Sequence, residues 1–463
     1  MGDRVDVVIV GAGPAGVFAA LELSRESDLD IVILDKGPDI DRRHCPSREP
    51  GGRCVHCDPC AIMSGWGGAG AFSDGKLTLS PSVGGRLTDI LGADAVEALI
   101  RRVDETYVSF GAEGPIFGTR TDEIERLEKR AALAGLRFVS VPIRHMGTER
   151  CVEIMRGMRD ELLERGVEVR TRTGVAEILT EDDRVVGVET EAGERIEAEV
   201  VVVAPGREGA GWFKGVADEL GLTVGRNPVD LGVRVELPAV VLEPITEMVY
   251  ESKFIYYSKA FDDRVRTFCM CPYGEVSTEF AGDVMTVNGH SFADSRTSNT
   301  NFALLVSKTF TEPFDDPIAY GKSIARLANL LGDGVIVQRL GDLESGRRST
   351  PKRMSRSVVT PTLASATPGD LNLVLPYRYV VTILEMLYAL DEVAQGVASR
   401  HTLLYGVEVK FYSCRLRLTR EMETEVENLF ACGDGAGVTR GLVQASASGL
   451  LAARAILGRL GGG

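Results

Sequence analysis

The sequence predicts an α/β protein, and three segments support this class. Residues 5–10 are β-branched and almost entirely apolar, which is typical of a strand buried on both faces of a parallel sheet. A glycine turn and an apolar helix at residues 17–25 follow this strand directly. Residues 167–197 alternate in short runs, and residues 428–435 are a strand that enters a Gly-Asp-Gly turn. Together these segments predict a Rossmann-like domain with a parallel sheet and a β-meander.

The N-terminal glycine turn has the spacing of a dinucleotide-binding fingerprint. Gly11 permits a tight turn, Gly13 lets a pyrophosphate approach the backbone, and Gly16 lets the helix pack closely on the strand. The first amides of the helix lack internal partners and attract phosphate. The next strand, residues 31–34, is followed by Asp35, which is placed to accept hydrogen bonds from an adenosine ribose. We expect an ADP-containing cofactor here, rather than a turn that is glycine-rich by chance. The expected contacts are Gly11, Gly13, Pro14, Ala15, Gly16, Asp35 and Lys36.

Length, charge and composition limit the class of protein further. A chain of 463 residues is expected to form two or three domains, and 44% hydrophobic with 26% charged residues is typical of a globular protein. The net charge of -15 argues against a nucleic-acid partner and against binding to an anionic membrane. No apolar run is long enough to cross a membrane, and the first strand begins at Val5, which leaves no room for a signal peptide. We therefore expect a cytoplasmic protein without a membrane or nucleic-acid partner.

A second glycine-rich segment lies at residues 64–70. Its glycines remove side chains where a backbone must come close to something flat or anionic. A mobile surface loop is the alternative, but Trp66 and Phe72 favour burial. The segment is therefore expected to pack against a ligand of that kind.

Four cysteines precede this segment in a stretch with almost no apolar residues to bury. Cys45, Cys54, Cys57 and Cys60 contain two Cys-x-x-Cys steps that share Cys57, so three thiolates can converge on one point and Cys45 can complete a four-ligand set. Three interpretations remain open: a metal or iron–sulfur centre, a redox disulfide, and a reduced, metal-free loop that packs on the first domain.

The middle of the chain predicts the rest of the first domain and a second one. A helix at residues 151–165 precedes the short strands, and a buried strand at residues 200–203 ends in Ala204-Pro-Gly206. The following segment has mixed strands and helices without a second glycine fingerprint, so a Rossmann site for NAD(P)H is not expected. The expected division is a cofactor-binding domain of residues 1–215, completed by residues 418–463, and an inserted α+β substrate or cap domain of residues 216–417.

Two motifs far apart in the chain resemble one superfamily. An N-terminal Gly-x-Gly-x-x-Gly turn, together with a strand and a Gly-Asp-Gly turn near the C-terminus, is similar to flavoproteins of the glutathione reductase and fumarate reductase superfamily. Over nearly its whole length the chain also resembles a group of archaeal and bacterial FAD-dependent dehydrogenases, through residues 54–60, 67–76, 268–272 and 432–435. The resemblance implies FAD and oxidoreductase chemistry, but it implies no substrate. One departure is Asp35, which stands where many flavoproteins have Glu.

The resemblance also implies roles for particular residues. The glycine-rich segment would wrap the pyrophosphate and the flavin, Val175 would contact adenine through its backbone, and Gly206 would return the chain beneath the cofactor. Asp434 would hydrogen-bond the ribityl chain, and the last helix would direct its N-terminus at the flavin N1 and O2 edge. The contacts implied in this way are Gly67, Gly68, Val175, Ala204, Gly206, Gly433, Asp434, Gly441, Leu442 and Val443.

Two functions from different classes remain open. In the first, the protein is an FAD-dependent dehydrogenase or reductase that transfers a hydride between flavin N5 and a small metabolite. In the second, FAD passes electrons to a carrier protein through a metal or iron–sulfur centre at Cys45, Cys54, Cys57 and Cys60.

Three further features have both a functional and a structural interpretation. The first is a group of cations with no acid among them: Arg347, Arg348, Lys352, Arg353 and Arg356. It is either a pocket for an anionic substrate or a solvated loop that balances nearby acids. His290 is either a general base or a histidine satisfied at a turn. Cys269 and Cys271 are expected to face the same side of a strand, either as redox partners or as buried core cysteines.

Overall fold

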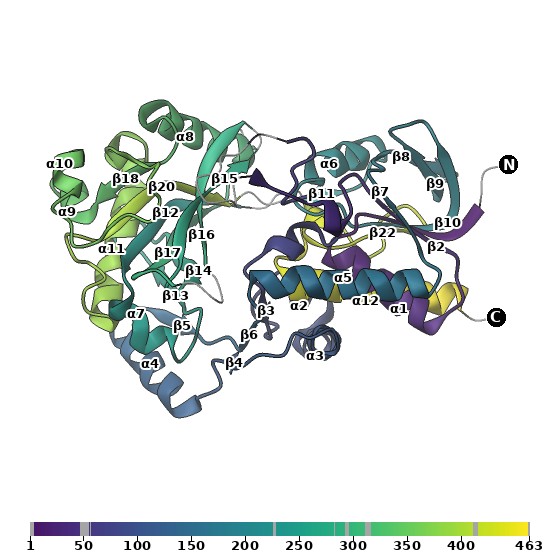
Figure 1. The fold of residues 1–463 in the computed structure, drawn as a ribbon, viewed down its shortest axis with the longest axis horizontal. Helices are drawn as coiled ribbons and strands as arrows, with labels where there is room; N and C mark the ends of the chain where they lie inside the picture. The colour runs from purple at the N-terminus through teal and green to yellow at the C-terminus, as the bar shows by residue number, and fades with distance from the viewer. Residues whose placement is uncertain are drawn as a thin grey trace. The chain divides into compact units, whose positions relative to one another are not determined.

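The computed structural model divides the chain into two compact units (Figure 1). It describes residues 4–46, 55, 57–225, 228–281, 283–291, 296–310, 316–410 and 415–461. Unit 1 comprises Met1–Pro115, Arg144–Asn227 and Ser413–Gly463, and unit 2 comprises Ile116–Ile143 and Pro228–Tyr412. No helix within the described residues combines the length and the hydrophobicity that a membrane crossing requires.

Unit 1 is built on a sheet in the order β7-β2-β1-β10-β9-β8, and β22 pairs with the C-terminal half of β10. The strands β7, β2, β1, β10 and β22 run parallel, whereas β8 and β9 add an antiparallel meander. The predicted Rossmann-like fold is therefore confirmed. The strands are β1 (Arg4–Val10), β2 (Ile31–Asp35), β7 (Glu168–Thr171), β8 (Val175–Glu181), β9 (Arg184–Thr190), β10 (Arg195–Val203) and β22 (Leu429–Ala431).

The helices of unit 1 bring the two ends of the chain together. The first helix, α1 (Pro14–Glu26), packs closely along the last, α12 (Leu442–Leu460). A Cβ atom on Gly449 of α12 would lie 2.0 Å from the carbonyl oxygen of Ala15, so only glycine permits this approach. The other elements of this unit are η1 (Ile40–Arg42), η3 (Gly68–Phe72), β3 (Lys76–Thr78), α2 (Leu87–Leu91), α3 (Ala93–Ser109), α5 (Thr148–Glu164), α6 (Ala210–Glu219), β11 (Val224–Gly225), β21 (Arg415–Leu416) and η5 (Asp434–Ala436).

Unit 2 is built on a sheet in the order β19-β18-β20-β12-β17-β14-β13-β5, which is antiparallel except where β18 pairs with β19. Its strands are β5 (Arg137–Val139), β12 (Val229–Pro238), β13 (Lys253–Tyr257), β14 (Arg264–Cys271), β17 (Asn299–Lys308), β18 (Ile336–Arg339), β19 (Thr367–Pro368) and β20 (Leu403–Lys410), with a separate hairpin of β15 (Glu275–Ala281) and β16 (Val284–His290). Its helices are α4 (Thr121–Leu133), α7 (Ala239–Thr246), α8 (Pro317–Gly332), α9 (Leu340–Glu344), α10 (Pro351–Met354) and α11 (Tyr377–Val393).

The structure corrects the expected domain boundaries. Residues 216–225 and 415–417, which were expected in the cap domain, belong to unit 1. Residues 116–143 belong to unit 2, although the sequence pattern placed them in the first domain. The reason is that β5 pairs with β13, and the Phe138 and Phe254 rings lie 5.1 Å apart between these strands. The helix α4 packs on α11 in the same unit. A contact between segments so far apart in the chain leaves no local pattern from which it could be predicted.

Candidate cofactor-binding site

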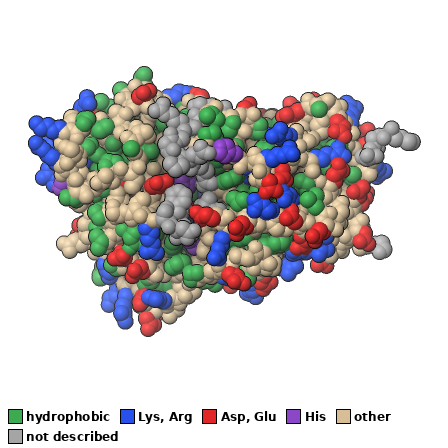
Figure 2. Space-filling view, in the orientation of Figure 1, with side chains coloured by type: hydrophobic (Ala, Val, Ile, Leu, Met, Phe, Trp, Pro, Cys, Tyr) green, Lys and Arg blue, Asp and Glu red, His purple; other side chains and the backbone are tan. Residues whose placement is uncertain are grey.

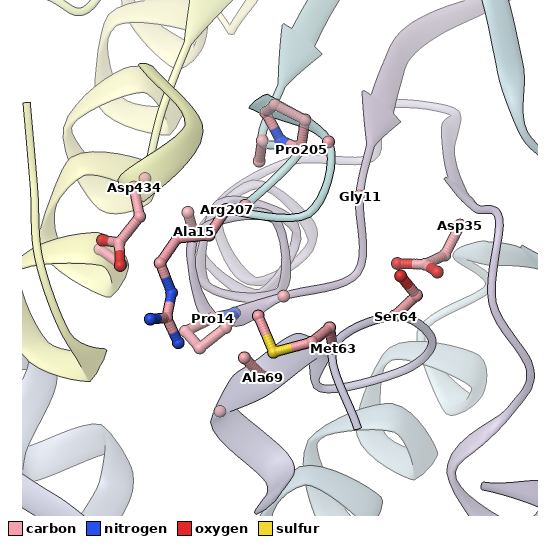
Figure 3. Close-up of a pocket in the computed structure, with 18 of the residues that line it drawn as sticks. Gly11, Pro14, Ala15, Asp35, Met63, Ser64, Ala69, Pro205, Arg207 and Asp434 are labelled. Atoms are coloured by element: carbon pink, nitrogen blue, oxygen red, sulfur yellow. The ribbon is translucent and has the colours of Figure 1, made fainter. Parts of the chain in front are cut away.

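Unit 1 contains a cavity of ≈ 310 Å³ at the carboxyl ends of its parallel strands. The segments that follow β1, β2, β10 and β22 all contribute to its wall, as open α/β sheets generally place their ligands. Figure 3 shows Asp35 and Asp434 at opposite ends of the labelled residues, with Gly11, Pro14 and Ala15 between them. The cavity is therefore long and passes directly over the N-terminal glycine turn.

Each glycine of the N-terminal turn has a separate steric reason. Gly11 has a φ of 106°, and a Cβ there would lie 2.3 Å from the carbonyl oxygen of Ala204. A Cβ on Gly16 would lie 2.0 Å from the carbonyl oxygen of Gly11. Gly13 differs, because its φ of -77° suits any residue and the nearest atom to an added Cβ, the Cα of Gly68, is 4.0 Å away. Gly11 and Gly16 avoid clashes with the protein backbone, whereas the missing side chain at Gly13 leaves space in the cavity.

The N-terminus of α1 faces this room without a side-chain cap. Gly13 is the capping residue, and within the described residues the first turn has no side-chain cap. Both Gly13 and Pro14 line the cavity. Uncapped amides and the helix dipole together form a site for an anion, and here they fit the pyrophosphate of a dinucleotide.

Asp35 holds the strand ends together as well as lining the cavity. Its Oδ1 accepts hydrogen bonds from the amides of Gly37 (2.8 Å) and Gly65 (2.9 Å), and its Oδ2 accepts one from the amide of Ala12 (2.9 Å). Burial raises the pKa of Asp35, and these amides and the charge of Arg43 act in the opposite direction. Because each carboxylate oxygen can accept two hydrogen bonds, Oδ2 retains one position for the predicted ribose hydroxyl.

Ser64 supplies an unsatisfied polar atom beside Asp35. Its Oγ is buried and has no hydrogen-bond partner within the described chain, yet the residue lines the cavity (Figure 3). Buried hydroxyls are nearly always paired, so this atom fits a ligand hydroxyl or phosphate oxygen. Sequence reasoning did not single out Ser64 as a contact, because a serine in a glycine-rich segment resembles an ordinary turn residue.

The glycine-rich segment packs onto the glycine turn instead of forming a surface loop. Trp66 is fully buried, and its Nε1 donates to the carbonyl oxygen of Met155 at 2.7 Å. Gly68 comes so close to the turn that a Cβ on it would lie 2.9 Å from the Cα of Gly13. Gly68 lines the cavity, whereas Gly67 does not and serves the backbone turn with a φ of 81°.

Arg43 organises this segment, and the sequence analysis missed it. Its guanidinium donates to the carbonyl oxygens of Trp66 (2.6 Å), Gly68 (2.8 Å) and Ile62 (2.6 Å), and it lies 4.6 Å from the centre of the Phe72 ring. Charge-assisted hydrogen bonds of this kind fix a loop that has few apolar side chains. No local pattern signals this role, because the acceptors are main-chain groups.

The remaining predicted contacts divide between the two ends of the cavity. Val175 lies at the Asp35 end, where the amide of Thr173 donates to the carbonyl oxygen of Asp35 at 2.8 Å. Ala204 and Gly206 follow β10, and both line the cavity. The predicted cofactor residues that line it are Gly11, Gly13, Pro14, Ala15, Asp35, Lys36, Gly68, Val175, Ala204, Gly206, Gly433, Asp434, Gly441 and Leu442. Gly16, Gly67 and Val443 are not part of its wall.

The other end is formed by Asp434 and the start of α12. Thr439 donates its hydroxyl to Oδ1 of Asp434 at 2.9 Å, and the amide of Gly441 donates to Oδ2 at 3.4 Å. Burial raises the pKa of Asp434, and the charge of Arg207 opposes this rise. Gly441 precedes α12 with a φ of 83° and provides no side-chain cap. The cavity therefore has a second uncapped helix N-terminus, at the end opposite Asp35.

The cysteine cluster can be described only in part. Cys54 and His56 lie outside the described residues. Cys57 is exposed, whereas Cys45 and Cys60 are half-buried, and burial raises the pKa of Cys60. Within the described residues, no group of three metal-ligating side chains includes Cys45, Cys57 or Cys60. Whether a four-ligand set forms with Cys54 remains a prediction.

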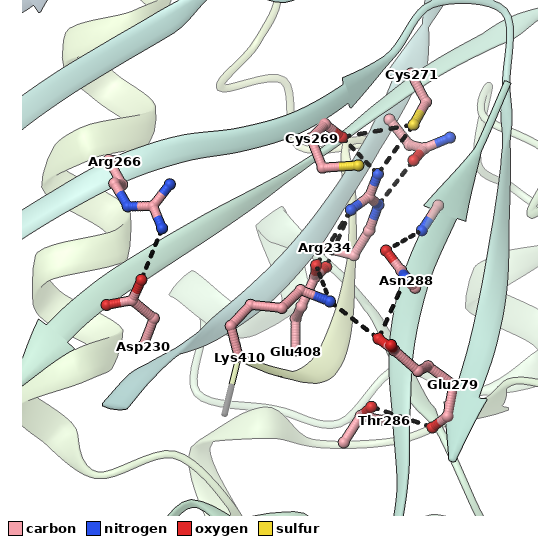
Figure 4. Close-up of polar contacts among 12 residues, drawn as sticks. Asp230, Arg234, Arg266, Cys269, Cys271, Glu279, Thr286, Asn288, Glu408 and Lys410 are labelled. Atoms are coloured by element: carbon pink, nitrogen blue, oxygen red, sulfur yellow. Dashed lines mark hydrogen bonds and ion pairs between the residues drawn. The ribbon is translucent and has the colours of Figure 1, made fainter. Parts of the chain in front are cut away.

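Cys269 and Cys271 belong to a buried polar network in unit 2 (Figure 4). A β-bulge lies between Phe268 and Cys271, and Cys269 has a φ of 46°, so the regular strand that the sequence predicted is interrupted here. The fully buried Arg234 donates to Glu408 at 3.2 Å, to the carbonyl oxygen of Cys269 at 2.7 Å and to Sγ of Cys271 at 3.3 Å. With Asn301 as a further acceptor, this network uses every N–H group of the guanidinium.

The basic cluster and His290 also lie in unit 2. Figure 2 shows cationic side chains gathered over α9 and α10. Asp342 is buried beside them, and it pairs with Arg347 at 2.9 Å and Arg353 at 3.9 Å. For Arg347 and Arg353, the structural interpretation therefore holds, because these two cations balance a nearby acid. His290 is half-buried at the end of β16, opposite Glu275 in the hairpin.

A parallel sheet, a glycine fingerprint and a long cavity with two uncapped helix ends define a dinucleotide-binding protein of the flavoprotein class. The chain belongs to the FAD dependent oxidoreductase family, whose model matches residues 6–301. A second family, described as FAD-dependent protein, C-terminal domain-like, matches residues 228–411. FAD is therefore the cofactor and the protein is an oxidoreductase, as the sequence predicted. The open cradle at Gly13 and the unsatisfied hydroxyl of Ser64 fit this cofactor.

The individual relatives described next share little sequence identity with this chain. A protein of Clostridium beijerinckii, named as an uncharacterized protein, is 27% identical over 97% of this chain and 80% of its own length. Among solved structures, L-proline dehydrogenase from P. horikoshii is 14% identical with a TM-score of 0.41, and the match covers 100% of this chain and 95% of that one. Glycine oxidase from Bacillus cereus is 13% identical with a TM-score of 0.40, and the match covers 98% and 96% of the two chains.

Proposed function

We propose that the protein is a dehydrogenase or reductase whose substrate is a small metabolite. The observation that supports this proposal is that one cavity of unit 1 passes two uncapped helix N-termini, those of α1 and α12. When bound, FAD supplies hydride transfer at its N5 atom. The task of the chain is to hold the cofactor in one orientation and to stabilise charge where it develops.

The residues of the cavity divide this task between them. Gly13 and the first amides of α1 would hold the pyrophosphate, while Asp35 and Ser64 would accept or donate hydrogen bonds at the adenosine side. Asp434 would bind the ribityl chain, and the amides that start α12 at Gly441 would stabilise negative charge at the flavin. These assignments follow from the order of the fingerprint, because the acid after β2 lies on the adenosine side of the turn.

The basic cluster supports the proposal that the metabolite is an anion. Arg348, Lys352 and Arg356 are exposed, and none of them forms an ion pair within the described part of the chain. Cations that are not used by the fold can bind a carboxylate or a phosphate group. The proposal therefore includes carboxylates and phosphate esters in the substrate class.

The experiment is a turnover assay of the FAD-loaded chain with an artificial electron acceptor. The panel contains neutral and anionic metabolites, with NADH and NADPH as further donors. We expect at least one small metabolite to reduce the flavin, and we expect neither nicotinamide to do so rapidly at micromolar concentration, because the chain has one glycine fingerprint only. Rapid, saturable reduction by NADPH would show that the nicotinamide part of this expectation is wrong.

The electron-transfer alternative gives a different result in the same assay. A protein of that kind would exchange electrons with a reduced carrier protein such as ferredoxin without any metabolite. It would also contain iron and sulfide after anaerobic purification, held by Cys45, Cys54, Cys57 and Cys60. Reduction by the carrier alone, together with stoichiometric iron, would replace the dehydrogenase proposal, whereas zinc would not, because zinc has no redox chemistry.

A further inference from the structure

An ion pair of Lys76 and Asp74 lies in the wall of the cavity. The Nζ atom of Lys76 is 2.9 Å from Oδ2 of Asp74, and the side chain of Lys76 is only 6% exposed. Both residues line the cavity. A lysine is seldom buried to this extent, because removing an ammonium group from water is costly unless a partner compensates. The site therefore contains two opposite charges that no predicted cofactor contact uses.

The turn that carries these residues explains why both reach the cavity. Gly75 separates them with a φ of 69°, and a Cβ on it would lie 2.7 Å from the carbonyl oxygen of Gly147. The amide of Met146 donates to the carbonyl oxygen of Gly75 at 2.8 Å, and this hydrogen bond fixes the backbone of the turn. The turn formed by the sequence Asp-Gly-Lys thus holds the carboxylate and the ammonium side by side in the cavity wall.

The pair belongs to the flavin half of the cavity. The strand β3, which begins at Lys76, packs on α12, whose first residues form the end of the cavity opposite Asp35. A Cβ on Gly70, just before this turn, would lie 2.9 Å from the side chain of Leu442 at the start of α12. Asp35 marks the adenosine side, so the segment from Gly70 to Lys76 lies on the other side of the pyrophosphate.

The charge of Lys76 already affects a neighbouring group. The pKa of His145 is lowered first by burial and then by the charge of Lys76, and Asp74 opposes both effects. Charges in a poorly solvated site act on their neighbours more strongly than charges in water. The same reasoning applies to any group whose charge changes within the cavity.

We propose that Lys76 and Asp74 set the reduction potential of the bound flavin in opposite directions. This inference rests on the proposed placement of FAD. Reduction by a hydride adds one negative charge to the flavin, so a nearby ammonium stabilises the reduced form and a nearby carboxylate destabilises it. Lys76 therefore favours uptake of a hydride from substrate, and Asp74 limits that preference.

The test is the midpoint potential of the FAD-loaded full chain, measured by equilibration with a redox dye. We expect Lys76→Met to lower the potential by at least about 30 mV, which is a tenfold change in the ratio of reduced to oxidised flavin for two electrons. Asp74→Asn should raise the potential. The double variant, which removes both charges, should lie between the two single variants. A role in folding alone would not produce shifts of opposite sign.

Lys214 of α6 provides a matched control in the same unit, outside the wall of the cavity. Its Nζ lies 2.6 Å from Oδ2 of Asp218, and both side chains are more than half exposed. Lys214→Met should leave the potential unchanged. Shifts of the same sign for Lys76→Met and Asp74→Asn, or an equal shift for Lys214→Met, would overturn the inference while the proposed function stands. A parent chain that binds no FAD would instead overturn the proposed function.

Discussion

A Gly13→Val variant is expected to fold and to lose its FAD. The backbone at Gly13 has a φ of -77°, which suits valine, and the nearest protein atom to an added Cβ is 4.0 Å away. The side chain would therefore enter the cavity where the pyrophosphate approaches α1. We expect FAD affinity to fall at least about a hundredfold, or ~2.8 kcal/mol at 1.4 kcal/mol per tenfold. Flavin retained after gel filtration measures this, with circular dichroism as the check on folding.

Gly11→Val is the contrasting variant. Its Cβ would lie 2.3 Å from the carbonyl oxygen of Ala204, and a φ of 106° is unfavourable for valine. This variant should lose both the fold of unit 1 and the flavin, whereas Gly13→Val should lose the flavin alone. A folded Gly13→Val protein that binds FAD as tightly as the parent would place the pyrophosphate elsewhere.

Arg234→Met is expected to cause the largest loss of stability in unit 2. Arg234 is fully buried, and its guanidinium is the partner of the equally buried Glu408. Breaking a buried ion pair costs about 3–5 kcal/mol. Without Arg234, Glu408 would keep Lys410, at 3.2 Å, as a cationic partner. Urea unfolding should show this as an earlier transition for the variant.

Two comparisons make this prediction specific. Arg326→Met removes an exposed pair with Asp283 in the same unit, and it should cost much less than Arg234→Met, because water and salt screen exposed charges. The double variant Arg234→Met with Glu408→Leu should recover part of the loss, because no unpaired charge remains. Equal effects of Arg234→Met and Arg326→Met would mean that the network contributes little to unit 2.

The glycine fingerprint could be predicted because its spacing is a local pattern. The steric reason at Gly16 is also local, since an added Cβ would meet the carbonyl oxygen of Gly11. At Gly11 an added Cβ would meet the carbonyl oxygen of Ala204, which lies far along the chain. The predicted parallel sheet followed from the same pattern, since strands buried on both faces are almost continuously apolar. The end of the cavity at Asp434 followed from resemblance, because a Gly-Asp-Gly turn alone does not identify a cofactor.

Other parts of the site depend on contacts between distant segments. Asp35 was expected to bind ribose, but the sequence could not indicate that it also accepts amides from Ala12 and Gly65. Arg43 was missed for the same reason, since it acts through carbonyl groups near Trp66. The bulge at Cys269 likewise has no sequence signal, because a Cys-x-Cys strand looks regular until its partner strand is known.

FAD binding by this cavity is tested most directly by the flavin content of the purified full chain after incubation with FAD. The extracted flavin is identified by mass and counted against protein. We expect one FAD per chain, which is lost in Gly13→Val and retained in Lys214→Met with an unchanged potential. FMN in place of FAD, or no flavin retained by a folded parent chain, would contradict the claim that this cavity binds the cofactor.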